Sequence, residues 1–486
     1  MASVSSLGIG SGLDLNALLA NLKSAEQAPL VVLQQQQRSY TAKLSAYGQI
    51  NGALSTLQSA ATALAKPELF QGLKAGSSAA DVLTAKATAS AASGSYSVNV
   101  TALAQAQSLA ASGVASTSAA IGAGTATTLT IDFGTITGGV LDPVSGQYSG
   151  AGFSADSTRT ATSITLDASN NSLAGIRDAI NANADIGVTA SIVNDGSATP
   201  NRLVLTSKQT GEASSMRIAV SGDAALSDLL AHDPAATQRL QQTVGAQNTR
   251  LSVNGIAITS ATQTVEGAIP DVTLTVAKVG SSTLTVQNDT ASVQAAITSF
   301  VNAYNGLQSA ASKLSAFNAD NRSAAALLGD STLRNIQVRI RSTLTVAQPP
   351  GDSSLTMLSH IGIAFQKDGS LTIDSAKLTT ALGSQLGGVA KLFSGSAGSG
   401  GYGNQMASLI TGMTADNGTL TAVTKGINTS LDMLGKQYTA TSERVEATVA
   451  RYKAQFTQLD VMMSTMNRTS AYLTQQFESM SNNNSK

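Results

Sequence analysis

Apolar residues recur at every seventh position along the last fifth of the chain. The register runs through Leu431, Tyr438, Val445, Tyr452, Leu459, Met466, Leu473 and Met480. Such a spacing keeps one seam of a helix facing a partner helix, which is the pattern of a coiled coil. At 1.5 Å per residue this register would cover roughly 75 Å, far more than the usual helix of a globular domain. The length predicts that this helix packs against other chains.

A shorter register of the same kind lies near the start of the chain. It runs through Leu33, Tyr40, Tyr47, Leu54 and Ala61, with Ile50, Leu57 and Leu64 at the second seam position. Asp14 can cap a first short helix, Pro29 can begin the next one, and Pro67 can end it. A seven-residue stripe also fits a bundle helix that packs within its own chain, so both interpretations of this register stay open.

The second seam of the C-terminal register is polar, because it holds Thr441, Thr448 and Gln455. Such a seam gives only a weak helix pair in isolation. We therefore expect the C-terminal helix to be disordered or loosely paired until the protein assembles.

Between the two helical ends the pattern changes to that of β-strands. Alternation of apolar and polar residues predicts strands at 96–100, 129–133, 163–166, 188–193, 202–206 and 216–220, and a β-meander over 250–286. Asn194-Asp195-Gly196 has the composition of a turn. The uncharged residues after Thr101 fit either a low-complexity linker or a β-element of an outer domain.

Helical periodicity appears inside the β-rich part and again after it. A short helix at 173–180 follows Ser172, which can serve as its N-cap. Longer helices are predicted from Thr290 onward and around 327–344, and Asp368-Gly369 predicts a hairpin turn.

The order of elements predicts an α+β multidomain protein. The terminal helices, residues 1–42 and 431–486, pair as a coiled-coil leg. Residues 43–75 and 287–430 form a helical bundle domain. The β-rich head domains are inserted in the middle of the chain, with an inner domain of residues 76–112 and 240–286 and an outer α/β domain of residues 113–239.

Composition removes several classes of function. The 486 residues include 29 basic and 29 acidic side chains, so the net charge is zero and long-range attraction to nucleic acid or anionic lipid is not expected. The absence of cysteine excludes disulfides and thiolate metal sites. No apolar run is long enough to cross a membrane. The first residues lack the basic and apolar regions of a secretory signal, which leaves a cytosolic location or export by a route that reads a disordered N-terminus.

The sequence offers no positive sign of catalysis. His232 and His360 are the two histidines, and we expect both to be ordinary core or surface residues. Zinc-binding pairs, nucleophile elbows and phosphate loops are absent from the sequence. The glycines of residues 8–12 imitate a nucleotide loop, but no strand precedes them. We therefore expect neither an enzyme nor a bound metal or cofactor.

Six motifs in the same order resemble the bacterial flagellar filament-capping family, also called flagellar hook-associated protein 2. The first motif, residues 5–15, contains Leu7, Gly8, Gly10, Gly12, Leu13 and Asp14. The others lie at 94–107, 300–305, 327–334, 361–371 and 452–460. Residues 113–239 match only loosely, as expected for the variable outer domain of that family.

The resemblance implies a structural role. Family members leave the cell through the flagellar type III channel without a cleaved signal peptide and form a ring, here five or six subunits, at the extracellular tip of the filament. Flagellin folds beneath the ring and is inserted there, the hook–filament junction protein is a further neighbour, and contact with nucleic acid or insertion into a membrane is not implied.

Particular residues follow from the two registers and the resemblance together. The expected oligomer and filament interface is Leu33, Tyr40, Tyr47, Leu54, Leu431, Tyr438, Val445, Tyr452, Leu459, Met466 and Leu473. The family also binds a dedicated export chaperone through its C-terminal end, and the candidates are Val461, Met462, Met466, Leu473 and Phe477.

Other functions remain as alternatives. A hook–filament junction protein or flagellin is the nearest one, although the opening glycine motif argues against both. A surface adhesin with a coiled-coil stalk is a second alternative, and adhesion could also be a secondary role of a cap. A flagellum-associated hydrolase would need a clustered site in residues 113–239, where the sequence offers none.

Overall fold

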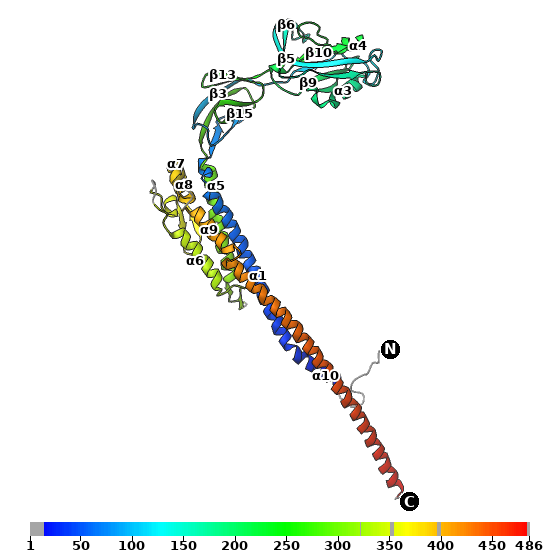
Figure 1. Ribbon diagram of the computed structural model, residues 1–486, viewed down its shortest axis with the longest axis vertical. Helices are drawn as coiled ribbons and strands as arrows, with labels where there is room; N and C mark the ends of the chain where they lie inside the picture. The colour runs from blue at the N-terminus through cyan, green and yellow to red at the C-terminus, as the bar shows by residue number, and fades with distance from the viewer. Residues whose placement is uncertain (1–13, 321, 350–353, 396–399, 484–486) are drawn as a thin grey trace. The chain divides into compact units, whose positions relative to one another are not determined.

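The computed structural model describes residues 14–320, 322–349, 354–395 and 400–483. The chain divides into two compact units, which we call the helical unit (Met1–Phe70 with Thr290–Lys486) and the β unit (Gln71–Asp289). Figure 1 shows long helices at both ends of the chain and strands in its middle. The predicted α+β fold, with β domains inserted between terminal helices, is confirmed.

The N-terminal helix α1 (Leu15–Ala65) is continuous through Pro29. The predicted break at this proline is therefore wrong. A proline inside a helix removes one backbone hydrogen bond, but the neighbouring Leu30 is buried, and packing of this turn can offset that loss. Asp14 is the N-cap, since its Oδ1 accepts a hydrogen bond from the Ala17 N–H at 2.9 Å. The helix ends just before Pro67, as predicted.

Most of the helical unit packs around the second half of α1, and α10 also runs along its first half. Its helices are α2 (Glu68–Gln71), α5 (Thr290–Ser315), α6 (Ser331–Thr345), α7 (Ser375–Ser384), α8 (Leu386–Ser394), α9 (Tyr402–Thr414) and α10 (Thr419–Asn483). Two short hairpins, β17 (Phe317–Asn318) with β18 (Ser323–Ala324) and β19 (Ile363–Phe365) with β20 (Leu371–Ile373), lie between them, the second turning at Asp368-Gly369 as predicted. Ile50, Leu54 and Leu57 of α1 are fully buried in the common core.

Two contacts fix α1 within this core. A Cβ atom on Gly403 of α9 would lie 2.8 Å from the Ala65 nitrogen and 2.9 Å from the Ala61 oxygen, so only glycine permits this approach of the two helices. The Tyr47 hydroxyl donates a 2.7 Å hydrogen bond to Asp330, whose carboxylate also caps α6. Burial and the Asp330 carboxylate raise the pKa of Tyr47.

The inner half of the N-terminal register therefore belongs to the chain's own core. Tyr47 and Leu54 are 1% and 0% exposed. The expectation that they face another subunit is corrected, because α5 and α9 already pack on this part of α1 and the Tyr47 hydroxyl is bonded to Asp330, the residue before α6.

The first domain of the β unit, which we call the inner β domain, consists of two facing sheets. One has the order β1-β16-β3-β12-β13 and the other β14-β15-β2. The strands are β1 (Leu73–Ser77), β2 (Leu83–Ala87), β3 (Gly94–Ala102), β12 (Thr249–Val253), β13 (Ile256–Ser260), β14 (Thr264–Ile269), β15 (Val272–Val276) and β16 (Gly280–Asn288). Buried residues of both sheets, such as Val98 and Leu284 from one and Leu274 from the other, form a single core.

The outer β domain has two further sheets, two helices and a core of its own. Its strands are β4 (Ser108–Ala110), β5 (Thr127–Leu141), β6 (Tyr148–Ala155), β7 (Thr162–Leu166), β8 (Val188–Asn194), β9 (Asn201–Ser207), β10 (Ser215–Ser221) and β11 (Gln241–Val244), and its helices are α3 (Leu173–Ala182) and α4 (Ala224–Leu230). The sheets have the orders β10-β5-β6, with β7 also on β5, and β11-β4-β9-β8. Ser172 caps α3 as predicted.

The border between the two β domains differs from the predicted one. Strands β4 and β11 pair within a sheet of the outer β domain, and Leu109 and Leu240 lie in its core. The boundary at 112 and 240 therefore cuts through a sheet. The chain crosses between domains at Gln105 and Gln247, which exchange two backbone hydrogen bonds of 2.8 and 3.1 Å. Strand β1 pairs with β16, so the inner β domain starts at Leu73 or earlier, before the predicted start at residue 76.

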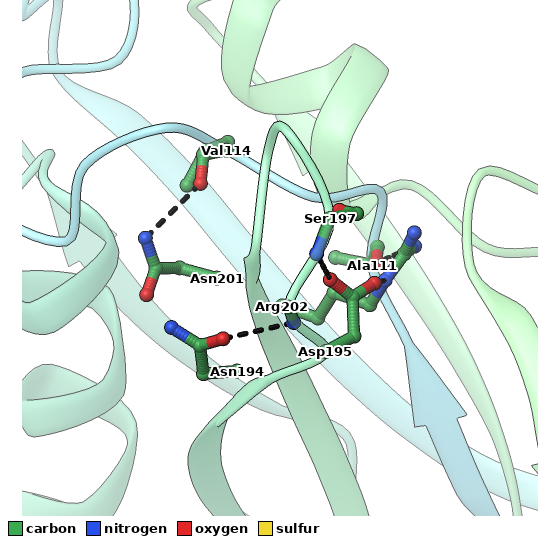
Figure 2. Close-up of polar contacts among 8 residues, drawn as sticks. Ala111, Val114, Asn194, Asp195, Ser197, Asn201 and Arg202 are labelled. Carbon is green, nitrogen blue, oxygen red and sulfur yellow. Dashed lines mark hydrogen bonds and ion pairs between the residues drawn. The ribbon is translucent and has the colours of Figure 1, made fainter.

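The turn between β8 and β9 shows how polar side chains order an exposed loop (Figure 2). Asp195 accepts a hydrogen bond from the Ser197 N–H at 3.0 Å and forms an ion pair with Arg202 at 2.5 Å. Both partners hold the pKa of Asp195 below its usual range. Arg202 also donates to the Ala111 carbonyl at 3.4 Å, which ties the turn to the segment after β4.

His232 is buried beside β10 and is 1% exposed. Its backbone pairs with that of Ile218, but neither ring nitrogen forms a hydrogen bond of normal geometry with any residue that the structure describes. Burial lowers the pKa of His232 from 6.5 to about 4, an effect that the main chain of Leu240 and the charge of Asp233 oppose only in part.

Acid is therefore expected to destabilise the outer β domain. In the unfolded chain His232 takes up a proton near pH 6.5, whereas in the folded domain it stays neutral until about pH 4. Its contribution is complete above pH 6.5 and is lost as the pH falls, by about 3 kcal/mol at pH 4. Calorimetry between pH 7.5 and 4.5 measures this slope. His232→Gln should remove most of it, whereas the exposed His360→Gln should not; equal slopes for wild type and His232→Gln would contradict the assignment.

Candidate assembly surface on the terminal helices

Helices α1 and α10 lie side by side and antiparallel within the helical unit (Figure 1). Two tyrosines of α10 form side-chain hydrogen bonds to α1. The Tyr438 hydroxyl accepts a hydrogen bond from Gln34 Nε2 at 3.1 Å, and the Tyr452 hydroxyl donates to Glu26 Oε1 at 3.3 Å. Residues later in α10 contact residues earlier in α1, so the two helices are antiparallel.

The first half of the C-terminal register faces α1 of the same chain. Leu431, Tyr438 and Tyr452 are half-buried, and Val445 is 5% exposed. On the α1 side Leu33 and Tyr40 are half-buried. These register residues are therefore largely covered by their own chain.

The second half of the register is uncovered. Exposed apolar side chains follow one stripe of the helix at Leu459, Met462, Met466, Leu473, Phe477 and Met480. Their spacings of three, four and seven residues place them on one face. Met466 is 57% exposed and Phe477 is 67% exposed. We call this surface the terminal stripe. A contiguous apolar stripe of this kind marks a surface for binding another protein.

The five chaperone candidates all lie on this uncovered part of α10. Val461, Met462, Met466, Leu473 and Phe477 are each exposed, although Val461 lies about 100–160° around the helix from the other four. Of the N-terminal motif the structure places Asp14 as the α1 cap. Leu7, Gly8, Gly10, Gly12 and Leu13 lie outside the described residues.

The sequence analysis did not predict the two hydrogen bonds between α1 and α10. Glu26 lies seven residues before Leu33 and so continues the N-terminal register, which is a signal that could have identified it. Gln34 is adjacent to that register and has no such signal. Its partner Tyr438 is 404 residues away, and a side-chain pair so distant in sequence has no local pattern.

Among the residues that the structure describes, no group of histidine, cysteine, aspartate and glutamate could hold a metal ion. No described helix is long and apolar enough to cross a membrane. The two helices offer an exposed apolar surface, the terminal stripe, and they are joined to each other by weak side-chain hydrogen bonds.

The fold and the terminal stripe together define the class of an assembly subunit: paired terminal helices carry an exposed apolar surface, and β domains are inserted in the middle of the chain. Family comparisons specify which one. Residues 11–107 match the family described as "Flagellar hook-associated protein 2 N-terminus", and residues 246–468 match "Flagellar hook-associated protein 2 C-terminus". The chain belongs to the flagellar hook-associated protein 2 family.

Individual relatives agree with this assignment. The chain is 41% identical to flagellar hook-associated protein 2 of Escherichia coli (strain K12) over 99% of this chain and 100% of the relative. It is 39% identical to the Salmonella typhimurium (strain LT2) protein over 99% of each chain. The crystal structure of the D1-D2-D3 domains of the flagellar cap protein FliD from Escherichia coli is 36% identical, covers 79% of this chain and 99% of its own, and has a TM-score of 0.60.

Family membership assigns the role of a flagellar cap protein to this chain. It does not favour the adhesin with a coiled-coil stalk or another axial protein. The predicted resemblance is confirmed.

Proposed function

We propose that this chain forms a homo-oligomeric ring of five or six copies at the distal tip of the flagellar filament. There it retains exported flagellin and promotes its folding and insertion, without catalytic activity of its own. The chain reaches the tip through the flagellar type III channel without a cleaved signal peptide. The hook–filament junction protein is the neighbour on which the ring first sits.

The observation that carries this proposal is the terminal stripe. An apolar helix face of this length costs free energy in water, and burial against neighbouring chains returns about 25 cal/mol for each Å² covered. The stripe is interrupted by the polar residues Thr469 and Ser470, so its contacts are weak enough to break and form again. A cap that moves after each flagellin addition needs contacts of that kind.

The same stripe serves the export chaperone before assembly. Met462, Met466, Leu473 and Phe477 would be covered by the chaperone in the cell and released at the tip. Covering them in the cytoplasm prevents premature association.

Deletion of the gene tests the function directly. Without the cap, flagellin is expected to appear as monomer in the medium, with stunted or missing filaments. Normal filaments and a medium free of flagellin would contradict the proposed role.

A double substitution tests the terminal stripe. Leu459→Asp with Met466→Asp places two charges on the apolar face and is expected to abolish ring formation, while both β domains stay folded. Light scattering measures the mass of the oligomer, and circular dichroism measures folding. The control, Val461→Asp with Tyr472→Asp, adds the same charges outside the stripe, about 110–130° around the helix from its middle. An unchanged oligomer mass in the Leu459→Asp, Met466→Asp variant would contradict the proposal for this surface.

A further inference from the structure

Helix α6 presents a basic face on a chain with few charges. Arg334, Arg339 and Arg341 lie on this helix of 15 residues, which contains no carboxylate. Between them Val338 is 66% exposed. The buried residues of α6 are Leu333, Ile336, Ile340 and Leu344. At 100° per residue, Val338 points roughly opposite to them.

Two hollows meet at Val338 and extend this face. One, of about 280 Å³, is lined by Arg341 of α6, Lys367 of the β19–β20 turn and Tyr304 of α5, among others. The other is lined by Arg334 and Arg339. We call Arg334, Val338, Arg339, Arg341 and Lys367 the basic face.

The charges of the basic face are not paired with carboxylates in the described part of the chain, although Asp368 lines the same hollow as Arg341 and Lys367. Among the residues that the structure describes, no ion pair joins the three arginines or Lys367 to a carboxylate. The Arg341 guanidinium lies over the Phe365 ring at 5.3 Å, and Arg334 donates to the Gly329 carbonyl at 3.3 Å. These contacts orient the side chains and leave their charge available.

Helix α10 presents a complementary acidic face in the same helical unit. Asp432, Glu443 and Glu446 lie within roughly 60° of one another around the helix, and each points about 100° or more away from the buried Val445. Gly435, Thr439 and Ala440 lie between them, and their small side chains leave a groove of about 460 Å³. Lys436 forms a 2.8 Å ion pair with Asp432, which leaves this face with a net charge of −2. We call it the acidic groove.

We propose that the basic face of one copy docks into the acidic groove of a second copy and forms a contact between neighbours in the ring, in addition to the contacts of the terminal stripe. This proposal rests on the homo-oligomer proposed above and names its interface. The two faces have opposite charge and each has an apolar or small-residue centre. Because the two faces are different, each copy of a docked pair keeps one face free, and repetition of such a contact closes a ring when the rotation between neighbours closes. The acidic groove lies on a different side of α10 from the one that packs on α1, so both contacts can exist together.

Cross-linking tests the contact, because the chain has no cysteine of its own. Full-length chains carrying only Val338→Cys are mixed with chains carrying only Thr439→Cys and oxidised mildly. We expect disulfide-linked dimers of the mixture at roughly ten times or more the yield of either variant alone. A mixture of Val338→Cys with Ser470→Cys, a position on the terminal part of α10, is the matched control. Equal yields in both mixtures would overturn the proposal.

Charge reversal gives an independent measure of the same contact. Arg339→Glu with Arg341→Glu, or Glu443→Lys with Glu446→Lys, should each raise the concentration needed for half-assembly by about tenfold or more. Mixing the two variants should restore assembly in part, because opposite charges meet again. Raising the salt concentration should weaken wild-type assembly.

The outcomes separate this inference from the proposed function. If the wild type assembles and the reversed variants assemble equally well, the interface is wrong and the ring remains. If the wild type stays monomeric at every concentration tested, the ring and the interface both fail. If the arginine variant assembles normally but arrests filament growth, the basic face binds a different acidic partner, which also overturns the proposal.

Discussion

Gly403→Ala is expected to destabilise the helical unit by about 2 kcal/mol, whereas Gly412→Ala on the same helix should stabilise it by up to about 1 kcal/mol. At Gly403 the added methyl group meets backbone atoms of α1, at 2.8 Å from the Ala65 nitrogen and 2.9 Å from the Ala61 oxygen. These backbone atoms belong to the last turn of α1, and they cannot turn aside as a side chain can. Overpacking of this kind costs about 1–3 kcal/mol and exceeds the gain in helix propensity.

Gly412 is a matched control, because it is also in α9 and has no atom within 4 Å of the position of an added Cβ. Only the helix propensity should then change, in favour of alanine. Thermal unfolding followed by circular dichroism at 222 nm compares the two variants with the wild type. Destabilisation by both substitutions, or by neither, would contradict the close approach of α9 to α1.

Deletion of residues 106–246, with Gln105 and Gln247 joined through Asn-Gly, should leave the inner β domain folded and cooperative. The two ends already exchange backbone hydrogen bonds of 2.8 and 3.1 Å, and Asn-Gly suits a two-residue turn between antiparallel strands. The interactions that this deletion removes at the border are polar. They include the hydrogen bond from the Thr210 hydroxyl to the Ala261 carbonyl at 2.7 Å and the ion pair between Arg250 and Glu212 at 2.8 Å.

The shorter deletion of residues 113–239 is the informative comparison. It keeps β4 and β11 but removes their neighbours β8 and β9, so that Leu109, Ala111 and Leu240 lose the core in which they are buried. We expect this variant to aggregate or to unfold without a sharp transition. Calorimetry and light scattering distinguish the two deletion variants. Similar behaviour of both would contradict the border at Gln105 and Gln247.

Features with local causes could be predicted from the sequence. The caps at Asp14 and Ser172 and the turn at Asp368-Gly369 each depend on residues within four positions, and all three occur in the structure. The seven-residue register predicted a long C-terminal helix for the same reason. Most predicted strands of the β unit have alternating patterns, which a half-buried sheet requires.

Features set by distant neighbours could not be predicted. A heptad register describes a seam but does not say which chain fills it, so Tyr47 and Leu54 looked the same as Leu459 and Met466. Strand β6 has the sequence Tyr-Ser-Gly-Ala-Gly-Phe-Ser-Ala, contains no buried residue and is held by pairing with β5. The basic face also escaped notice, because its significance depends on the lack of ion pairs around α6 among the described residues.

The chain enters and leaves the outer β domain at Gln105 and Gln247, so another domain could be inserted between these two residues. Neighbouring residues of an antiparallel pair that exchange hydrogen bonds have Cα atoms about 5.5 Å apart. Any compact domain whose own termini lie that close could replace the outer β domain without strain at the splice. A fluorescent or biotin-accepting domain inserted there would make single caps visible during filament growth, while the terminal helices stay unaltered.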